Sequence, residues 1–168
     1  YNQLILGLVY PKFEVMMLKR NVLLTGPPGI GKTSVFRRAV KNLKEKGWIV
    51  GGIICSEVRE GGTRVGFEIM DLSTGQRGWL AHINQSVGPK IGKYTVNLVD
   101  LDVIGVGAIL DSIQTADILA IDEIGPMELL SKGFNNALYD ALESGKPLLG
   151  TIHYNLTTSM VQDIKMRT

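Results

Sequence analysis

A glycine-rich stretch, GPPGIGKT, carries the most specific chemical signal in the sequence. It runs from Gly26 to Thr33 and matches the pattern G-x-x-x-x-G-K-[ST] at every fixed position. Glycines let the backbone curl so that successive N–H groups point at anionic oxygens, and a following helix presents its positive N-terminus to the same charge. Lys32 is expected to reach the β- and γ-phosphates of a nucleotide, and the Thr33 hydroxyl to ligate magnesium. The stretch therefore predicts a phosphate-binding loop (P-loop).

A second stretch, ILAIDEIG, places two acids at the end of an apolar run. A P-loop needs a strand whose end carries an aspartate for the magnesium shell, and Asp122 fits that role. Glu123 follows directly, where a carboxylate can orient the water that attacks the γ-phosphate, or accept its proton. An Asp-Glu pair at this place is typical of hydrolysing ATPases, so it favours hydrolysis over transfer of the phosphoryl group.

The segments around these residues predict a parallel sheet. Residues 21–25 (NVLLT) have the composition of a buried strand, apolar residues recur at helical spacing over residues 32–46, and residues 48–55 resume strand character. Strand, helix and strand in this order form a βαβ unit. Residues 117–122 and 147–153 are expected to be further strands, with helices over residues 103–115 and 134–143.

Residues 56–98 interrupt this rhythm. RVGFEIMDL and RGWLAHI alternate in polarity on either side of the turn STGQ, so we expect a β-hairpin inserted after the second strand, and residues 88–97 add a short strand. The predicted fold is one three-layer α/β domain of the P-loop NTPase type over residues 16–168, with a mainly parallel sheet and an inserted β-hairpin. We expect residues 1–15 to be an extension outside this domain, and the C-terminus to be truncated.

Composition limits the class of protein. The 168 residues are 45% apolar and 20% charged, which fits one globular domain. The formal net charge of +2 gives no reason to expect a nucleic-acid or membrane partner. The single cysteine, Cys55, cannot form an internal disulfide and is expected to be a buried thiol in a cytoplasmic protein.

Other polar residues are weaker candidates. Thr151 and His153 lie near the end of the last expected strand, where P-loop ATPases place a residue that senses the γ-phosphate, and either could do so. His82 has no cysteine or second histidine nearby in the sequence, so a metal site there is not expected. The stretch GPKIGKY (residues 88–94) either lines the nucleotide cleft or forms a solvated turn, and we favour the turn.

Four stretches of this sequence resemble the thermostable nucleoside-triphosphatases, the family that includes the human cancer-related nucleoside triphosphatase. They are TGPPGIGKT, SEVREGGTRVGFEIMDLSTGQRGWLAH, GPKIGKYTVNL and LAIDEIGPMELLSKGFNNAL, followed by KPLLGTIH, and they span roughly residues 20–153. The resemblance implies a cytoplasmic enzyme that cleaves ATP, GTP and other nucleoside triphosphates to diphosphate and phosphate with magnesium, slowly and with little base preference.

Carried over by position, the resemblance assigns catalytic roles to Lys32, Glu123 and Arg59. Arg59 falls on a characteristic arginine and would supply a transition-state cation, although an ion pair with Glu57 or Glu60 is the alternative. The chain departs from the family pattern at Pro126 and at Cys55-Ser56. The expected nucleotide-binding residues are Gly26, Pro27, Pro28, Gly29, Ile30, Gly31, Lys32, Thr33, Ser34, Leu119, Ala120, Ile121, Asp122, Glu123, Ile124 and Gly125.

These observations predict a magnesium-dependent nucleoside-triphosphatase that acts as a monomer, with Thr33 and Asp122 as the protein's metal ligands. Two alternatives stay open on the sequence. One is a nucleoside or nucleotide kinase, whose product is a phosphorylated acceptor. The other is a regulatory ATPase module that a partner such as nucleic acid stimulates.

Overall fold

The computed structural model describes residues 21–156 and residue 162. In this part of the chain eight strands form one mixed sheet, in the order β1-β8-β7-β2-β3-β4-β6-β5. The expected domain boundary between residues 15 and 16 and the expected truncation at the C-terminus lie outside the described residues. The strands are β1 (Asn21–Gly26), β2 (Val50–Glu60), β3 (Thr63–Asp71), β4 (Arg77–His82), β5 (Lys90–Ile91), β6 (Tyr94–Val96), β7 (Ile118–Ile124) and β8 (Leu148–His153).

The sheet has a parallel half and an antiparallel half that meet at β2. Strands β1, β8, β7 and β2 are parallel, with Gly26 opposite His153 and Ile54 opposite Asp122. Strand β3 pairs antiparallel with β2, and β4, β6 and β5 continue that half. The α/β class and the P-loop strand-helix order are as expected, but the antiparallel part is a continuation of the same sheet and is larger than one hairpin.

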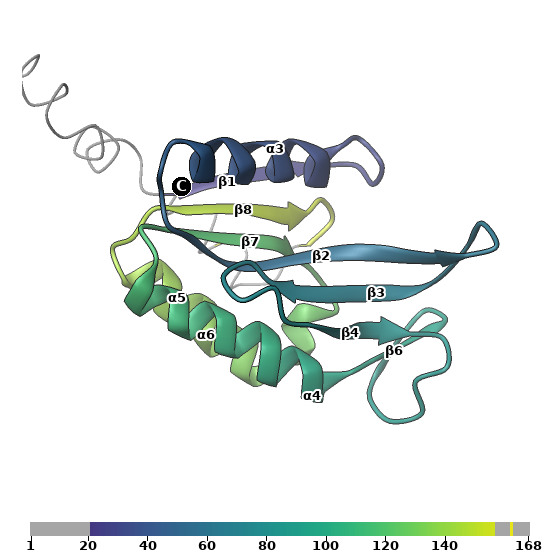
Figure 1. Ribbon diagram of the computed structural model, residues 1–168. Coiled ribbons are helices and arrows are strands. Elements are labelled where there is room, and N and C mark those ends of the chain that lie inside the picture. Colours follow the sequence, from purple (N-terminus) through teal and green to yellow (C-terminus); the bar gives the residue numbers. More distant parts are fainter. Residues whose placement is uncertain (1–20, 157–161, 163–168) are drawn as a thin grey trace, which may run out of the picture.

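The larger antiparallel half results from a turn that the sequence interpretation did not recognise. β2 continues to Glu60, well beyond residue 55 where we expected it to end. Gly61 and Gly62 both have positive φ, 53° and 81°, which is the backbone that a tight two-residue hairpin turn requires. The chain therefore reverses at this glycine pair, and the long β2–β3 ribbon extends beyond the neighbouring strands (Figure 1).

Helices cover both faces of the sheet and give three layers (Figure 1). Helix α3 (Lys32–Glu45) lies on one face, and α5 (Gly107–Thr115) and α6 (Lys132–Glu143) lie on the other. The expected helix over residues 103–115 begins earlier, because the Asn97 side chain accepts a hydrogen bond from the Asp100 amide and caps α4 (Leu98–Asp100). A π-helical stretch, η1 (Leu101–Val106), joins α4 to α5, and a 3₁₀ turn, η2 (Glu128–Leu130), precedes α6.

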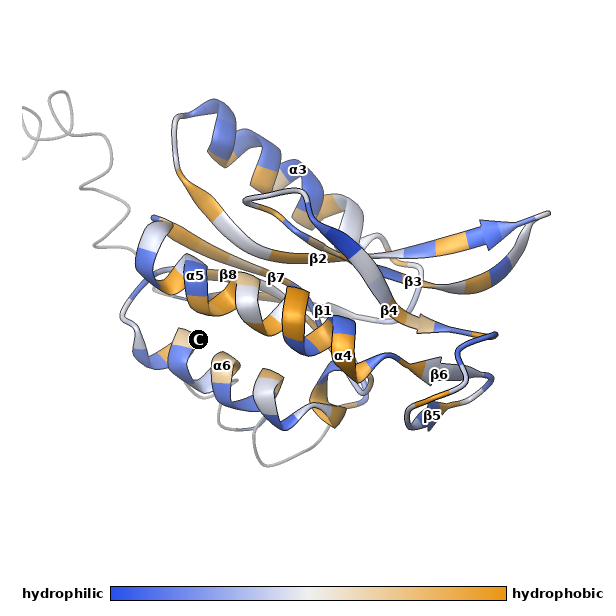
Figure 2. Cartoon of the chain, turned by 60° about the horizontal axis from the view of Figure 1, so that its bottom comes forward, coloured by the Kyte–Doolittle hydropathy of each residue, from blue (hydrophilic) through white to orange (hydrophobic). Residues whose placement is uncertain are grey.

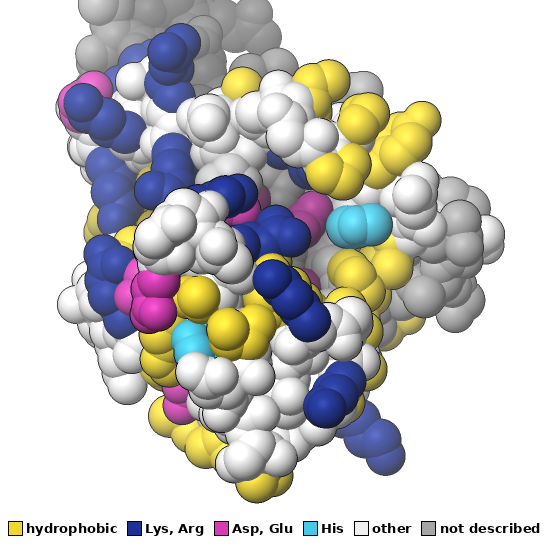
Figure 3. Space-filling view, turned by 90° about the vertical axis from the view of Figure 1, so that its right-hand side faces the viewer, with side chains coloured by type: hydrophobic (Ala, Val, Ile, Leu, Met, Phe, Trp, Pro, Cys, Tyr) yellow, Lys and Arg dark blue, Asp and Glu magenta, His cyan; other side chains and the backbone are white. Residues whose placement is uncertain are grey.

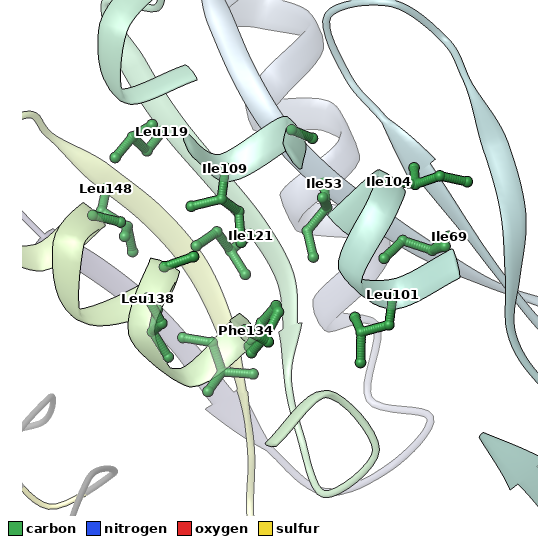
Figure 4. Close-up of a cluster of buried hydrophobic side chains, with 14 of the residues drawn as sticks. Ile53, Ile69, Leu101, Ile104, Ile109, Leu119, Ile121, Phe134, Leu138 and Leu148 are labelled. Carbon is green, nitrogen blue, oxygen red and sulfur yellow. The ribbon is translucent and has the colours of Figure 1, made fainter. Parts of the chain in front are cut away.

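The main core fills the space between the sheet and the α5–α6 layer (Figure 4). Ile53, Ile109, Ile121 and Phe134 are fully buried in it. A smaller cluster around Phe36 and Val40 packs α3 onto the opposite face. Helix α3 turns its apolar side to the sheet and its polar side outward, whereas the α4–η1–α5 stretch also presents apolar residues to the outside (Figure 2). Each fully buried residue of this size contributes about 1.5–3 kcal/mol relative to exposure, so the packing holds the parallel strands in fixed positions.

Parallel strands bring their carboxyl ends to one edge of a sheet. Here the ends of β1, β8 and β7 lie side by side, so the P-loop, the Thr151–His153 segment and the Asp122–Glu123 pair meet there. Among the described residues, no helix is both long and apolar enough to cross a membrane.

Candidate active site

The P-loop connects β1 to α3 with the backbone that its glycines allow. Gly29 and Gly31 have φ of 78° and 101°, a region that side-chain-bearing residues rarely adopt. Gly31 is also the N-cap of α3, and it supplies no side-chain hydrogen bond to the helix. The first amides of α3 are therefore left for an anion such as a phosphate to accept from.

Lys32 lies between the loop and the acids. Its Nζ donates a hydrogen bond of 3.0 Å to the Gly26 carbonyl and is 3.9 Å from Oε1 of Glu123. Only 14% of its side chain is exposed. The ammonium group therefore belongs to the interior of the site, where its charge acts on Glu123.

Asp122 is the most buried charged group of the site, with 1% of its surface exposed. Its Oδ1 accepts a hydrogen bond of 2.5 Å from the Thr151 hydroxyl and one of 3.4 Å from the Thr33 hydroxyl. Within the described part of the chain, its Oδ2 is buried and has no hydrogen-bond partner. Burial raises the pKa of Asp122, and the hydrogen bonds from Thr151 and Thr33 oppose that rise, as do the charges of Arg37 and Lys32.

These oxygens suit a magnesium ion. Mg²⁺ prefers carboxylate and hydroxyl oxygens and keeps several water or phosphate ligands rather than an all-protein cage. The described residues contain no group of three or more His, Cys, Asp or Glu side chains that could enclose a metal. The unpaired Oδ2 of Asp122 and the neighbouring Thr33 hydroxyl are the partial ligand set that such an ion uses. The expected ligands Thr33 and Asp122 thus fit the metal.

Glu123 faces the same space and remains accessible, because 32% of its side chain is exposed. Burial raises its pKa, while the charges of Lys32 and His153 lower it and the charge of Asp122 raises it. Acidic, basic and histidine side chains gather around a hollow on this side of the molecule (Figure 3). Glu123 is therefore a carboxylate that water can reach and that lies beside a cation.

Of the two sensor candidates, Thr151 contacts the acid pair directly. It is fully buried on β8 and donates to Asp122. His153 is half-buried at the strand end, and its Nδ1 has no hydrogen-bond partner among the described residues. Because β8 separates β1 from β7, both residues lie between the P-loop strand and the acid strand.

The structure does not bring Arg59 to the P-loop. Its Nε donates to Oε1 of Glu57 at 2.7 Å and its Nη1 donates to the Gly62 carbonyl at 2.9 Å. Ile54 is level with Asp122, and five further residues of β2 at about 3.3 Å each place Arg59 roughly 16 Å beyond. This arrangement is the ion pair with Glu57 that the sequence left as an alternative, and catalysis by Arg59 stays a prediction.

The remaining expected contact residues divide by position. Leu119, Ala120 and Ile121 are buried inside β7, so their side chains belong to the core. Lys90 and Lys93 are exposed, as the solvated-turn interpretation expects, but Tyr94 of the same stretch is buried at the start of β6 because it packs on Ala81 and Val96.

Two residues of this region escaped the sequence interpretation. Arg37 is one turn after Thr33 on α3; its Nη2 donates to the Ser56 hydroxyl, and its charge acts on Asp122. Arg37 is four residues after Thr33, so the two side chains lie on the same face of α3, and the sequence could have indicated this. Glu128, in the PMEL segment after the acid pair, is 4% exposed, and burial raises its pKa to about 8. No local pattern marks a buried acid in a loop.

Comparison with known proteins identifies the family. The sequence model of one family, described as NTPase, matches residues 21–168. This chain belongs to the NTPase family. The predicted family and its class of enzyme, a nucleoside-triphosphate hydrolase, are confirmed.

Curated relatives of this NTPase share 40–49% of its residues. Nucleoside-triphosphatase THEP1 of Thermofilum pendens is 49% identical over 143 residues, covering 85% of this chain and 79% of that protein. Nucleoside-triphosphatase THEP1 of Methanocaldococcus jannaschii is 43% identical, covering 80% of this chain and 78% of the relative.

Solved structures agree with the fold of the NTPase. A human cancer-related nucleoside triphosphatase, solved in solution, matches with a TM-score of 0.72 and 35% identity, covering 88% of this chain and 84% of that one. The crystal structure of THEP1 from Aquifex aeolicus matches with a TM-score of 0.76 at 24% identity, over 86% of this chain and 83% of that chain. The expected P-loop α/β fold is confirmed.

Proposed function

We propose that this NTPase hydrolyses nucleoside triphosphates to diphosphate and phosphate with Mg²⁺, using a water molecule that Glu123 orients. One observation carries the proposal: Glu123 is 3.9 Å from the ammonium group of Lys32, across from the P-loop. A base next to the phosphate-binding cation is what attack on a γ-phosphate requires. Family membership and the names of the relatives support the hydrolysis.

The residues divide the work between binding and activation. The amides of the P-loop and of the first turn of α3 would hold the phosphates, and Lys32 would neutralise the charge that develops on the γ-phosphate. Thr33 and Asp122 would hold Mg²⁺, which would neutralise part of the phosphate charge when bound. Glu123 would accept a hydrogen bond from the attacking water and then its proton.

We further propose that Arg59 approaches the γ-phosphate when nucleotide is bound. It lies on the projecting β2–β3 ribbon and has a half-exposed side chain, which a surface ion pair with Glu57 and a hydrogen bond to the Gly62 carbonyl hold in place. Such pairs are worth about 0–1 kcal/mol. A cation supplied in this way contributes about 10³–10⁵ in rate.

Broad use of ATP, GTP and other nucleoside triphosphates is part of the proposal, as are action in the cytoplasm and as a monomer. The near-neutral charge and the single cysteine support a cytoplasmic enzyme without a nucleic-acid partner.

The test is phosphate release from ATP and GTP, with and without Mg²⁺, for the wild type and for Glu123→Gln. We expect release that depends on the metal and a loss of about 10²–10⁴ in kcat for the variant. Unchanged turnover in Glu123→Gln would refute the assignment of Glu123 as the base. Labelled γ-phosphate on a nucleoside or monophosphate would favour a kinase instead, and strong stimulation by RNA or DNA would favour a regulatory module.

A further inference from the structure

Cys55 and Glu128 form a contact between β2 and the loop after β7, near the acid pair; Glu128 is buried, whereas Cys55, expected to be a buried thiol, is half-buried. Cys55 is on β2, one residue beyond Ile54, which is level with Asp122 on β7. Its thiol donates to Oε1 of Glu128, with 3.9 Å between sulfur and oxygen. The Glu123 backbone amide opposes the burial that raises the pKa of the thiol. The sulfur therefore lies close to the backbone of Glu123 and in contact with the Glu128 carboxyl group.

Glu128 holds the other side of the same segment. It lies in η2 and is 4% exposed, and the backbone amides of Glu128 and Gly125 oppose the rise in its pKa that burial causes. The Gly125 carbonyl in turn accepts a hydrogen bond of 3.1 Å from the Leu129 amide. A buried acid with several partners in one loop fixes the course of that loop.

Gly125 shows how closely Glu123 and Glu128 approach this backbone. A Cβ atom built at Gly125 would be 2.8 Å from Oε2 of Glu128 and 3.5 Å from Oε2 of Glu123. The first distance is too short for a real Cβ contact, so a side chain at Gly125 would force the buried Glu128 carboxyl group to shift. Both carboxyl groups therefore pack against one glycine, with no room for a side chain between them.

We propose that Glu128 and Cys55 act together as positioning residues for Glu123, fixing its backbone so that its carboxylate faces the P-loop. Neither residue touches the substrate in this proposal. It rests on the proposed function, since Glu123 must be the base for its position to matter in turnover. The Glu128 carboxyl group, unused by the reaction itself, then serves to keep the strand end rigid.

The first measurement does not depend on turnover. Hydrogen exchange followed by NMR gives the protection of individual amides in the wild type, Cys55→Ala, Cys55→Ser and Glu128→Ala. We expect Cys55→Ala and Glu128→Ala to speed exchange at Glu123 and Gly125 at least tenfold, and Cys55→Ser, which keeps a donor and an acceptor, to restore most of the protection. Unchanged exchange at Glu123 in both alanine variants would refute the proposal that Cys55 and Glu128 fix the Glu123 backbone.

The second measurement tests whether the position of Glu123 affects the rate of hydrolysis. We expect both alanine variants to lower kcat at least tenfold while the Kd for a fluorescent ATP analogue stays within twofold. Asp71→Asn is the matched control: Asp71 is also buried and caps a turn, at Ser73 and Thr74, but away from the P-loop. Its kcat should not change even if its Tm falls.

The two measurements separate the possible failures. Faster exchange at Glu123 with unchanged kcat overturns the positioning role. A wild type that releases no phosphate refutes the proposed function, and the exchange data still decide whether the pair fixes the backbone. If each alanine variant lowers kcat, the double variant should cost no more than the worse single one, because the two residues act as a unit.

Discussion

The Thr151 hydroxyl donates a hydrogen bond of 2.5 Å to Oδ1 of Asp122 from the neighbouring parallel strand. Both residues are buried, with 0% and 1% of their surfaces exposed. The strand that separates the P-loop from the acid pair thus also solvates the carboxylate that we expect to bind the metal.

Replacing Thr151 by valine should destabilise the protein by about 1–3 kcal/mol, because a buried carboxylate loses a hydrogen-bond donor. The free energy of unfolding from urea titrations measures this loss. Thr95→Val is the matched control, since Thr95 is equally buried on β6 in the antiparallel half. Equal losses in the two variants would contradict a special role for the contact with Asp122.

Replacing Lys32 by alanine should weaken nucleotide binding, because the ammonium group that faces the phosphates is lost. We expect the Kd for a fluorescent ATP analogue to rise by at least tenfold, as for a charge-assisted contact of about 1.5–3 kcal/mol. Lys41→Ala serves as the control, because that side chain is 75% exposed and pairs with Glu45 on the outer surface of α3. A Kd unaffected by Lys32→Ala would argue against this loop as the phosphate site.

Adding Mg²⁺ together with a non-hydrolysable ATP analogue should raise the Tm more than the analogue alone, because ligands that bind only the folded state stabilise it. Asp122→Asn should abolish that extra increment, since it replaces a ligand oxygen by an amide nitrogen. Differential scanning fluorimetry with EDTA as the reference checks both. An increment that survives in Asp122→Asn would place the metal elsewhere.

Arg59→Ala should lower kcat by about 10³ if the ribbon delivers the guanidinium to the γ-phosphate. Stability should change by less than about 1 kcal/mol, because the pair with Glu57 is on the surface. Arg77→Ala is the control: Arg77 also forms an exposed pair, with Glu68 on the adjacent strand. Identical kcat values in the two variants would leave Arg59 with the ion pair alone.

The stability of the nucleotide-free protein should fall as the pH rises through the titration of Glu128. Burial raises its pKa to about 8, and the charges of Glu123 and Asp122 add to the rise. In the unfolded chain a glutamate titrates near about 4.3. Its contribution is therefore full below about pH 4.3 and is lost toward about pH 8, by up to about 1.4 kcal/mol per pH unit. Chemical denaturation across this range should give a flatter profile for Glu128→Gln, and parallel profiles would contradict the assignment.

The parts of the site that sequence could predict are those that a continuous stretch specifies. The P-loop pattern fixes its own turn and the helix after it, and the ILAID run fixes a buried strand that ends in acids. Both were placed correctly, together with the strand of Thr151. Their neighbourhood follows from the rule that parallel strands end at one edge.

The parts that sequence did not predict depend on contacts between distant segments. Cys55 and Glu128 are 73 positions apart, and nothing local indicates that a thiol on β2 meets an acid in the loop after β7. The glycine pair at residues 61–62 was a readable turn signal that would have extended β2. Arg59 could be assigned a role from its position in the motif, but the motif does not specify the direction in which the β2–β3 ribbon projects. The sequence therefore could not predict whether its side chain lies near the P-loop.

The position of β8 between β1 and β7 has a consequence for biosynthesis. A ribosome makes the P-loop first, the acid pair about ninety residues later, and β8 last among the described strands. β8 lies between β1 and β7, and these two strands do not pair with each other directly. A nascent chain that lacks β8 therefore contains the P-loop and the acid pair but not the strand that connects them in the sheet. The P-loop and the acid pair are therefore brought together in the sheet only once β8 has been made and has paired with both strands.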